Sequence, residues 1–312
     1  MIAEHVSTFS IVARAMNGDI GIAVASRYFA VGSVVPWAEA ELGAVATQAN
    51  VNVGFGPGGL ELLRQGMSAQ AALDRLREQD RFEGNTGRQV AIVDAKGGVA
   101  VHTGTKASAW AGHASGQGWS VQGNILQGPD VLKAMSVAFE KSKDELAEKL
   151  YAALQAGDSA GGDSRGRQSA ALLVVRKQGG RNLNNDRLVS INVDDHPRPL
   201  EELRRLLNLN HAYLARNQSY EYLAAGNAGE ALDCAARAYH LAPDHTDVRI
   251  YLAFLRYLAG EKKAALEEFQ RIRRADDNFN QLWQATLEFR TRFKAVLEDD
   301  HFVGQVFSEE LL

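Results

Sequence analysis

The sequence predicts an α+β fold in two parts: a domain of mixed strands and helices over residues 1–200 and an all-α domain over residues 201–312. Several short runs in the first part alternate apolar and polar residues with a two-residue period, which indicates β-strands. From Leu200 onward alanine, leucine, glutamate and arginine dominate, with almost no strand signal. The length of 312 residues agrees with two domains.

Residues 8–26 predict the first β-hairpin. Residues 8–13 and residues 19–26 both follow the two-residue period of a strand. The Asn17-Gly18 pair between them is a strong signal for a short hairpin loop, because both residues tolerate positive φ angles. Thr8 is the first residue of this predicted strand pair.

Thr8 is also the first candidate for a catalytic group. If the amino group of a threonine is free, that amine, with an ordinary pKa of about 7.7 to 8.0, can take the proton from the threonine's own hydroxyl. The alternative is that Thr8 is a β-branched residue that simply begins a strand. The residues alone leave both interpretations open.

Residues 42–52 predict a further strand with unusually many polar positions. Buried amides and hydroxyls need hydrogen-bond partners. These side chains therefore either face solvent or line a site. The positions are Thr47, Gln48, Asn50 and Asn52.

Residues 54–59, Gly-Phe-Gly-Pro-Gly-Gly, predict a flexible turn before a short helix that begins at Leu60. Ser68 is expected to cap the next helix. The glycines lack the spacing and the Gly-Lys-Ser/Thr ending of a phosphate-binding loop. We therefore expect no nucleotide site, and no cofactor is expected.

The rest of the first domain predicts five more strands and two more helices. One helix follows Gly128-Pro129, because proline suits the first turn, and the other starts with a capping box at residues 142–145. Gly157 is expected to end the second helix. The strands are expected at residues 89–94, 99–103, 119–126, 170–175 and 188–193.

The loop at residues 161–169 has an unusual composition immediately before a buried strand. It contains Asp163, Arg165, Arg167 and Gln168. Guanidinium groups at the end of a buried strand could hold a ligand carboxylate by paired hydrogen bonds. The alternative is a solvated loop, or an Asp-Arg pair that closes it.

Asp194, Asp195 and His196 raise the question of a metal site. Adjacent residues on an extended chain point apart, and a third ligand is not evident in the sequence. A capping and turn role is therefore favoured over a metal-dependent hydrolase, and no metal ligands are assigned.

The all-α domain contains an internal repeat. Gly226 and Gly260 stand 34 positions apart, as do Ala231 and Ala265. This period resembles a tetratricopeptide repeat. With about two repeats visible, the domain is expected either to bind a protein partner or to serve as a structural cap.

Composition excludes several classes of function. A net charge of -4 argues against nucleic-acid or anionic-membrane binding by bulk electrostatics. No apolar run is long enough to span a bilayer, and the first residues lack the features of a signal peptide. We therefore expect a cytoplasmic protein, in which the single Cys234 is a buried packing residue.

Seven blocks of the first domain together resemble the domain-of-unknown-function 1028 family of bacterial proteins, whose fold is similar to that of N-terminal-nucleophile (Ntn) hydrolases. The resemblance implies a four-layer αββα sandwich, two stacked antiparallel sheets with helices outside. The blocks are residues 8–14, 21–26, 30–36, 43–48, 120–126, 161–173 and 193–197.

The resemblance implies a function as an amidohydrolase that cleaves an amide or peptide-like C–N bond of a small polar substrate, with Thr8 as nucleophile. The roles beyond Thr8 come from residue chemistry and not from the family. Prepositioned donors near Gln48 and Asn124 would stabilise the oxyanion. Ser26 and Ser33 would orient the amine. Asp163, Arg165, Arg167 and Gln168 would bind substrate.

One departure from the family bears on this function. Residues 1–7 precede Thr8, so its nitrogen is an amide that cannot act as a base. The hydrolase hypothesis therefore requires a chain that begins at Thr8 when it works. The alternative is a catalytically silent binding or scaffold protein whose repeat domain recruits a partner, and in either case we expect a homo-oligomer.

Overall fold

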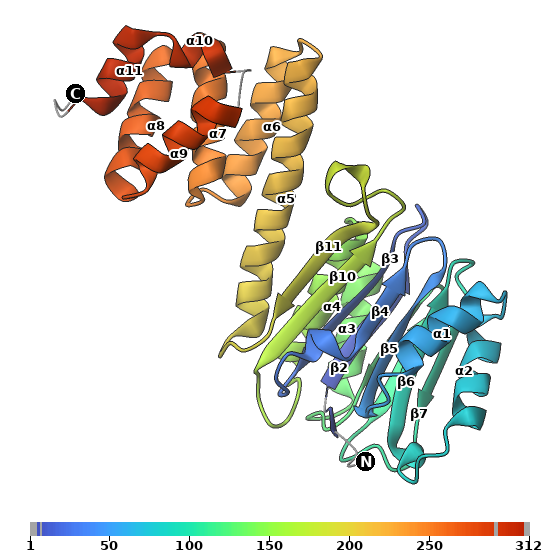
Figure 1. Cartoon of the computed structure of the whole chain (residues 1–312). Coiled ribbons are helices and arrows are strands. Elements are labelled where there is room, and N and C mark those ends of the chain that lie inside the picture. The colour runs from blue at the N-terminus through green and yellow to red at the C-terminus, as the bar shows by residue number, and fades with distance from the viewer. Residues whose placement is uncertain (1–4, 7, 290–292, 309–312) are drawn as a thin grey trace. The chain divides into compact units, whose positions relative to one another are not determined.

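The computed structural model describes residues 5–6, 8–289 and 293–308. Its contacts divide the chain into two compact units, Met1–Arg204 and Arg205–Leu312. The first unit mixes strands and helices, and the second is helical (Figure 1). The α+β class with an all-helical C-terminal region is confirmed. In the part of the chain that the structure describes, no helix combines the length and apolar character needed to cross a membrane.

The first unit contains two antiparallel sheets. In the five-stranded sheet the order is β1-β5-β6-β7, and β4 also pairs with β5. Its strands are β1 (His5–Val6), β4 (Pro36–Glu39), β5 (Gly43–Asn50), β6 (Arg88–Asp94) and β7 (Val99–Thr103).

The six-stranded sheet has the order β11-β10-β3-β2-β9-β8. The predicted first hairpin forms its centre, with Thr8 directly opposite Ser26. The edge strand β8 lies in a segment for which the sequence predicts no strand. The strands are β2 (Thr8–Arg14), β3 (Ile20–Ser26), β8 (Gly112–Gly116), β9 (Trp119–Gly123), β10 (Ser169–Val175) and β11 (Arg187–Val193).

Helices cover the outer face of each sheet, which gives the αββα layering (Figure 1). Helices α1 (Phe55–Arg64) and α2 (Ala69–Gln79) pack on the five-stranded sheet. Helices α3 (Asp130–Lys141) and α4 (Leu146–Ser159) pack on the six-stranded sheet. Helix α4 starts later than the capping box predicted, because the Ser142 hydroxyl bonds to Asp144 within the preceding turn.

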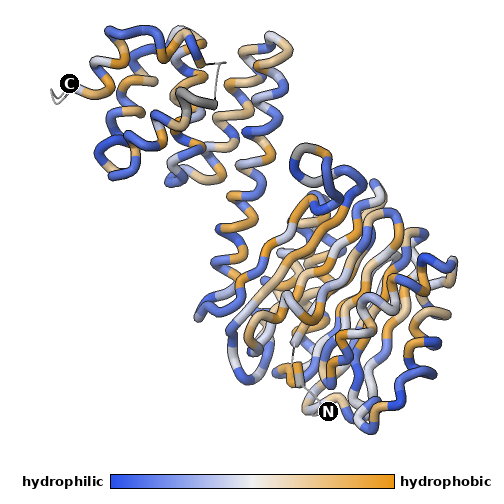
Figure 2. The backbone as a smooth tube through the Cα atoms, in the orientation of Figure 1, coloured by the Kyte–Doolittle hydropathy of each residue, from blue (hydrophilic) through white to orange (hydrophobic). Residues whose placement is uncertain are grey.

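An apolar core fills most of the space between the sheets. Val12, Ile22 and Val24 of the hairpin contribute to it, together with Ala44 and Ala46 of β5. Figure 2 shows hydrophobic residues concentrated along the paired strands and hydrophilic residues along the loops that join them. This packing fixes which parity of each strand faces the opposite sheet, and therefore where its polar residues point.

The glycine cluster at residues 54–59 is helical, so the predicted flexible turn is wrong. Helix α1 begins at Phe55 and contains three of the glycines. A Cβ at Gly56 would overlap the ring of Trp37, and a Cβ at Gly59 would lie 2.8 Å from a Val45 methyl. Glycine at these positions therefore lets the helix approach the sheet closely, at the expense of helix propensity.

The second unit contains helix pairs that repeat. Gly226 and Gly260 both follow the first helix of a pair with positive φ angles of 81° and 85°, which is the usual role of glycine after a helix. Phe254 stacks on Phe293 in its aromatic core, with ring centroids 4.5 Å apart. The helices are α5 (Pro199–Ala224, which begins in the first unit), α6 (Ala228–Leu241), α7 (Thr246–Leu258), α8 (Lys262–Ala275), α9 (Phe279–Phe289), α10 (Lys294–Leu297) and α11 (Asp300–Phe307).

Replacing Gly56 by alanine is expected to destabilise the first unit by about 1 to 3 kcal/mol, because the new methyl group overlaps the Trp37 ring. Gly58→Ala on the same helix is the matched control. Its nearest neighbour is a Leu76 methyl at 3.2 Å, which can turn aside, so that variant should be close to neutral. Urea unfolding followed by circular dichroism measures both, and equal midpoints would contradict the close-packing explanation.

Candidate active site

A row of polar residues crosses one end of the six-stranded sheet. Thr8 of β2 lies opposite Ser26 of β3, and Ser26 lies opposite Ser169 of β10. Asn124, immediately after β9, continues the row on the other side of Thr8, because Phe9 pairs with Gly123. The four side chains are between 0% and 3% exposed. The sheet thus brings together residues that lie far apart in the sequence.

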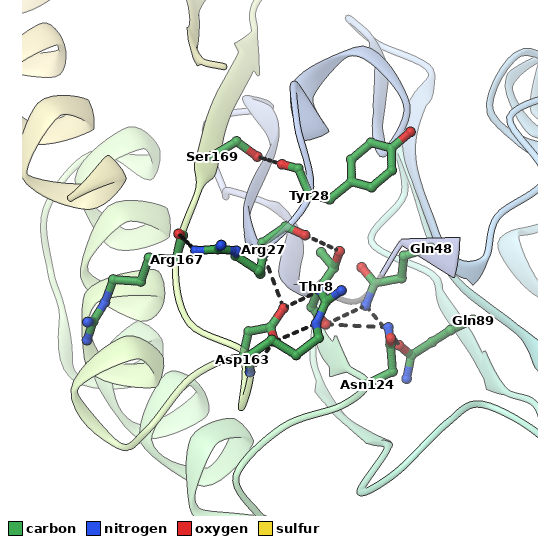
Figure 3. Close-up of polar contacts among 11 residues, drawn as sticks. Thr8, Arg27, Tyr28, Gln48, Gln89, Asn124, Asp163, Arg167 and Ser169 are labelled. Atoms are coloured by element: carbon green, nitrogen blue, oxygen red, sulfur yellow. Dashed lines mark hydrogen bonds and ion pairs between the residues drawn. The ribbon is translucent and has the colours of Figure 1, made fainter. Parts of the chain in front are cut away.

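Thr8 is held at both its hydroxyl and its carbonyl group (Figure 3). Its hydroxyl donates to Ser26 Oγ at 3.1 Å. Its carbonyl oxygen accepts from Gln48 Nε2 at 3.2 Å and from the backbone N–H of Asn124 at 3.0 Å. Asn124 Nδ2 is a third, more distant donor at 3.5 Å. Both sheets therefore fix the position of Thr8.

Further buried amides extend this row into a polar layer between the two sheets. Gln48 of β5 pairs in register with Gln89 of β6, and Gln48 Nε2 donates to Gln89 Oε1 at 2.8 Å. Ser10 donates to Gln48 Oε1 at 2.6 Å. Gln122 Nε2 donates to the Ala46 carbonyl at 3.1 Å. We call these side chains the polar layer: Thr8, Ser10, Ser26, Gln48, Gln89, Gln122, Asn124 and Ser169.

Two acceptors of the polar layer have no partner among the described residues. They are Gln122 Oε1 and Asn124 Oδ1, and both residues are fully buried. An unsatisfied buried acceptor costs about 1 to 3 kcal/mol, and such groups are rare in native interiors. The layer therefore retains hydrogen-bonding capacity close to Thr8.

The backbone is strained directly after both amides that hold Thr8. Ala49, which follows Gln48, has a φ angle of 64°, and Ile125, which follows Asn124, has a φ angle of 51°. The left-handed region is unfavourable for a β-branched residue such as isoleucine. Strain of this kind persists where the surrounding structure enforces it, and it is concentrated at functional sites.

The loop at residues 161–168 closes on itself beside Thr8. The Asp163 carboxylate accepts from the backbone N–H of Arg27 at 3.1 Å, from the backbone N–H of Arg165 at 2.9 Å and from Arg165 Nη2 at 2.8 Å. Its side chain is only 1% exposed, whereas that of Arg165 is 38% exposed. Asp163 therefore anchors the loop and orients Arg165 within it.

Arg167 and Gln168 have other partners. Arg167 Nε donates to Asp158 at 2.7 Å, and this hydrogen bond raises the pKa of the guanidinium. Figure 3 shows the Arg167 side chain directed away from Thr8. Gln168 Nε2 donates to Asp195 at 3.1 Å. Both side chains therefore contact carboxylates that lie outside the loop at residues 161–168.

Ser33 lies apart from the polar layer. It is exposed, and its hydroxyl donates to the Ala30 carbonyl at 2.7 Å.

His196 Nδ1 accepts from the backbone N–H of Arg198, which is a turn contact. Across residues 5–6, 8–289 and 293–308, no three His, Cys, Asp or Glu side chains gather as a metal would require.

Sequence reasoning missed four members of the polar layer: Ser10, Gln89, Gln122 and Ser169. Each occupies a strand position whose side chain either faces the opposite sheet or lies in the row that contains Thr8. Their signal was a polar residue at a core-facing position of a buried strand. That signal becomes readable only once strand parity and register are known.

Comparisons with known proteins agree with this architecture. The model of a family of unknown function, DUF1028, matches residues 8–203, and a tetratricopeptide repeat model matches residues 222–287. Among solved structures, a DUF1028 protein from Silicibacter pomeroyi is 32% identical, with a TM-score of 0.59 over 64% of this chain and 84% of that chain. A comparison with curated proteins finds no match.

The family match begins at Thr8 and ends at the last residues of the first unit. It therefore covers every residue of the polar layer and the whole of the loop at residues 161–168. A model that matches more than half of the chain, together with a similar solved structure of the same family, shows that this chain belongs to the DUF1028 family.

Proposed function

We propose that this chain is an N-terminal-nucleophile amide hydrolase whose nucleophile is Thr8. The observation that carries the proposal is the setting of Thr8 in the polar layer, with its carbonyl fixed by Gln48 and Asn124 and its hydroxyl directed to Ser26. The hydroxyl's partner is another hydroxyl, which is a weak base. A stronger base is therefore needed, and the amine of a chain that begins at Thr8 supplies one.

The reaction then follows from a free Thr8 amine. The amine takes the proton of Thr8 Oγ1 as this oxygen attacks the substrate carbonyl, forming a tetrahedral oxyanion. The C–N bond breaks, and the leaving nitrogen takes the proton from the ammonium group. Water then attacks the acyl carbon of the ester while the same amine takes its proton, the bond to Thr8 Oγ1 breaks, and Oγ1 takes that proton back from the ammonium group as the acid leaves.

The segment before Thr8 bears directly on this proposal. His5 and Val6 pair with Asn50 and Ala49 as strand β1, and Val6 is fully buried in the core between the sheets. Thr8 itself is 0% exposed with this segment in place. Removal of residues 1–7 would free the Thr8 amine and would also take away the buried strand β1.

Neighbouring side chains receive roles from their contacts. Gln48 Nε2 already donates to the Thr8 carbonyl and to Gln89, so Gln48 acts as a positioning residue and not as an oxyanion donor. Asn124 Oδ1, which lacks a partner among the described residues, is a suitable acceptor for the Thr8 ammonium. Arg165, held by Asp163 and partly exposed, would contact a substrate carboxylate.

A chain whose first residue is Thr8 should hydrolyse members of a panel of small amides, and the same chain with Thr8→Ala should not. Loss of the nucleophile should reduce turnover to background, because no other group forms the acyl intermediate. Release of the amine product measures turnover, and circular dichroism checks folding. Equal turnover by the two chains would rule out Thr8 as nucleophile.

Ser26→Ala in the Thr8-first chain should lower kcat by about tenfold to a hundredfold, since the hydroxyl of Thr8 loses its hydrogen-bond partner. Ser33→Ala is the control, because the Ser33 hydroxyl bonds only to the Ala30 carbonyl in the described structure and lies outside the polar layer. Steady-state kinetics compare the two. A similar kcat for both variants would remove Ser26 from the mechanism.

A second function is favoured by the helical unit. Tetratricopeptide repeats are associated with protein binding, and a model of this repeat matches residues 222–287. In this alternative the first unit is catalytically silent and the chain serves as a binding or scaffold protein. A Thr8-first chain that folds normally and turns over no amide would favour this second function over the first.

A further inference from the structure

A separate pocket lies on the outer face of the five-stranded sheet. His102 of β7 is opposite Val90 of β6, and Val90 packs in the same apolar cluster as residues of α1 and α2. His102 therefore faces the helices and not the polar layer. The pocket has a volume of about 220 Å³ and is lined by Arg77, Asp80, Asn85, Thr86, Arg88, His102, Gly104 and Thr105.

A buried ion pair forms one wall of the pocket. Arg88 Nε donates to Asp80 Oδ2 at 2.8 Å, and the two side chains are 6% and 5% exposed. Arg88 also donates to the carbonyls of Asn50 and Val51, and its guanidinium lies 4.8 Å from the ring of Phe82. The Asp80 charge is thus neutralised by Arg88 and does not balance the other cations of the pocket.

Apart from the Arg88–Asp80 pair, the ionisable groups of the pocket are Arg77, which is cationic, and His102, which becomes cationic on protonation. Arg77, near the end of α2, and His102 line the same space, and Asp80 is the one acid among the eight lining residues. Burial lowers the pKa of His102, and the positive charges of Arg77 and His113 lower it further. The hydroxyls of Thr86 and Thr105 add neutral hydrogen-bonding groups. The charge of Arg77 is not balanced by an acid of the pocket, so the pocket favours an anion as its ligand.

We propose that this pocket binds a small oxyanion, such as the phosphate or sulfate group of a small ligand, between Arg77 and His102. Guanidinium groups recognise such groups by paired, charge-assisted hydrogen bonds. The volume is below the roughly 300 to 1,000 Å³ of sites for drug-sized ligands, which agrees with a small ion or a single ligand group.

The oxyanion pocket is distinct from the polar layer around Thr8, so the inference stands independently of the proposed hydrolase. Successive strand residues point to opposite faces, and Gln89 and Thr103 therefore face inward where Arg88 and His102 face outward. Gln89 Nε2 donates to Thr103 Oγ1 at 2.9 Å on that inner side. Strands β6 and β7 separate the two sites.

Binding of an anion should be linked to protonation of His102. The charged groups that line the pocket together with this imidazole are Arg77 and Asp80 of the α2 end and Arg88 of β6. His113 of β8 lies outside the pocket, and its charge also lowers the pKa of His102. A bound anion stabilises the imidazolium and so raises the pKa of His102 from its lowered value. By the reciprocity of linkage, the anion binds more tightly as pH falls through that pKa.

The test is an NMR titration of the histidine side chains of the full chain. Sulfate is the probe, because its charge stays constant where histidine titrates, and sodium chloride keeps the ionic strength equal in all samples. His102→Gln identifies the resonance. We expect the pKa of His102 to rise saturably with sulfate.

Two arginine variants of the same helix decide the result. Arg77→Ala should weaken sulfate binding about tenfold or more, which corresponds to the loss of one charge-assisted contact. Arg75→Ala removes an exposed arginine that does not line the pocket, so it should bind sulfate as the wild type does. No saturable shift in the wild type, or the same affinity in all three chains, would overturn the proposal.

Discussion

The hydrogen bonds to the Thr8 carbonyl are the constraint on which the rest of the candidate site depends. Gln48 reaches this oxygen from the five-stranded sheet, and Asn124 reaches it from the six-stranded sheet. Each donor is buried, so leaving it unpaired would cost about 1 to 3 kcal/mol. The two sheets are therefore fastened together at the residue whose chemistry the proposed function requires.

The interior between the sheets changes character along a single strand. Val12 of β2 belongs to the apolar core, whereas Ser10 and Thr8, on the same face, belong to the polar layer. The apolar part supplies the burial that stabilises the sandwich. The polar part is made of groups that are costly to bury, and hydrogen bonds within the layer offset much of that cost.

The sequence indicated the class of fold, the first hairpin and several members of the polar layer. The alternation of apolar and polar residues, the residues of the turn and the residue types can all be recognised within a short stretch of sequence. The register that sets Ser26 and Ser169 beside Thr8 is a long-range property, so Ser169 was missed and Ser33 was grouped with the site although it lies apart. The glycines of α1 were predicted to form a turn. The reason for glycine there is the close approach of Trp37, a tertiary contact that the local sequence does not reveal.

The mass of the intact purified protein tests the central claim most directly, because the proposed chemistry requires a Thr8 amine and residues 1–7 convert that amine into an amide. The account predicts that the active species begins at Thr8, with a mass lower than that of the full sequence by residues 1–7. A chain that hydrolyses amides while retaining those residues would contradict the account.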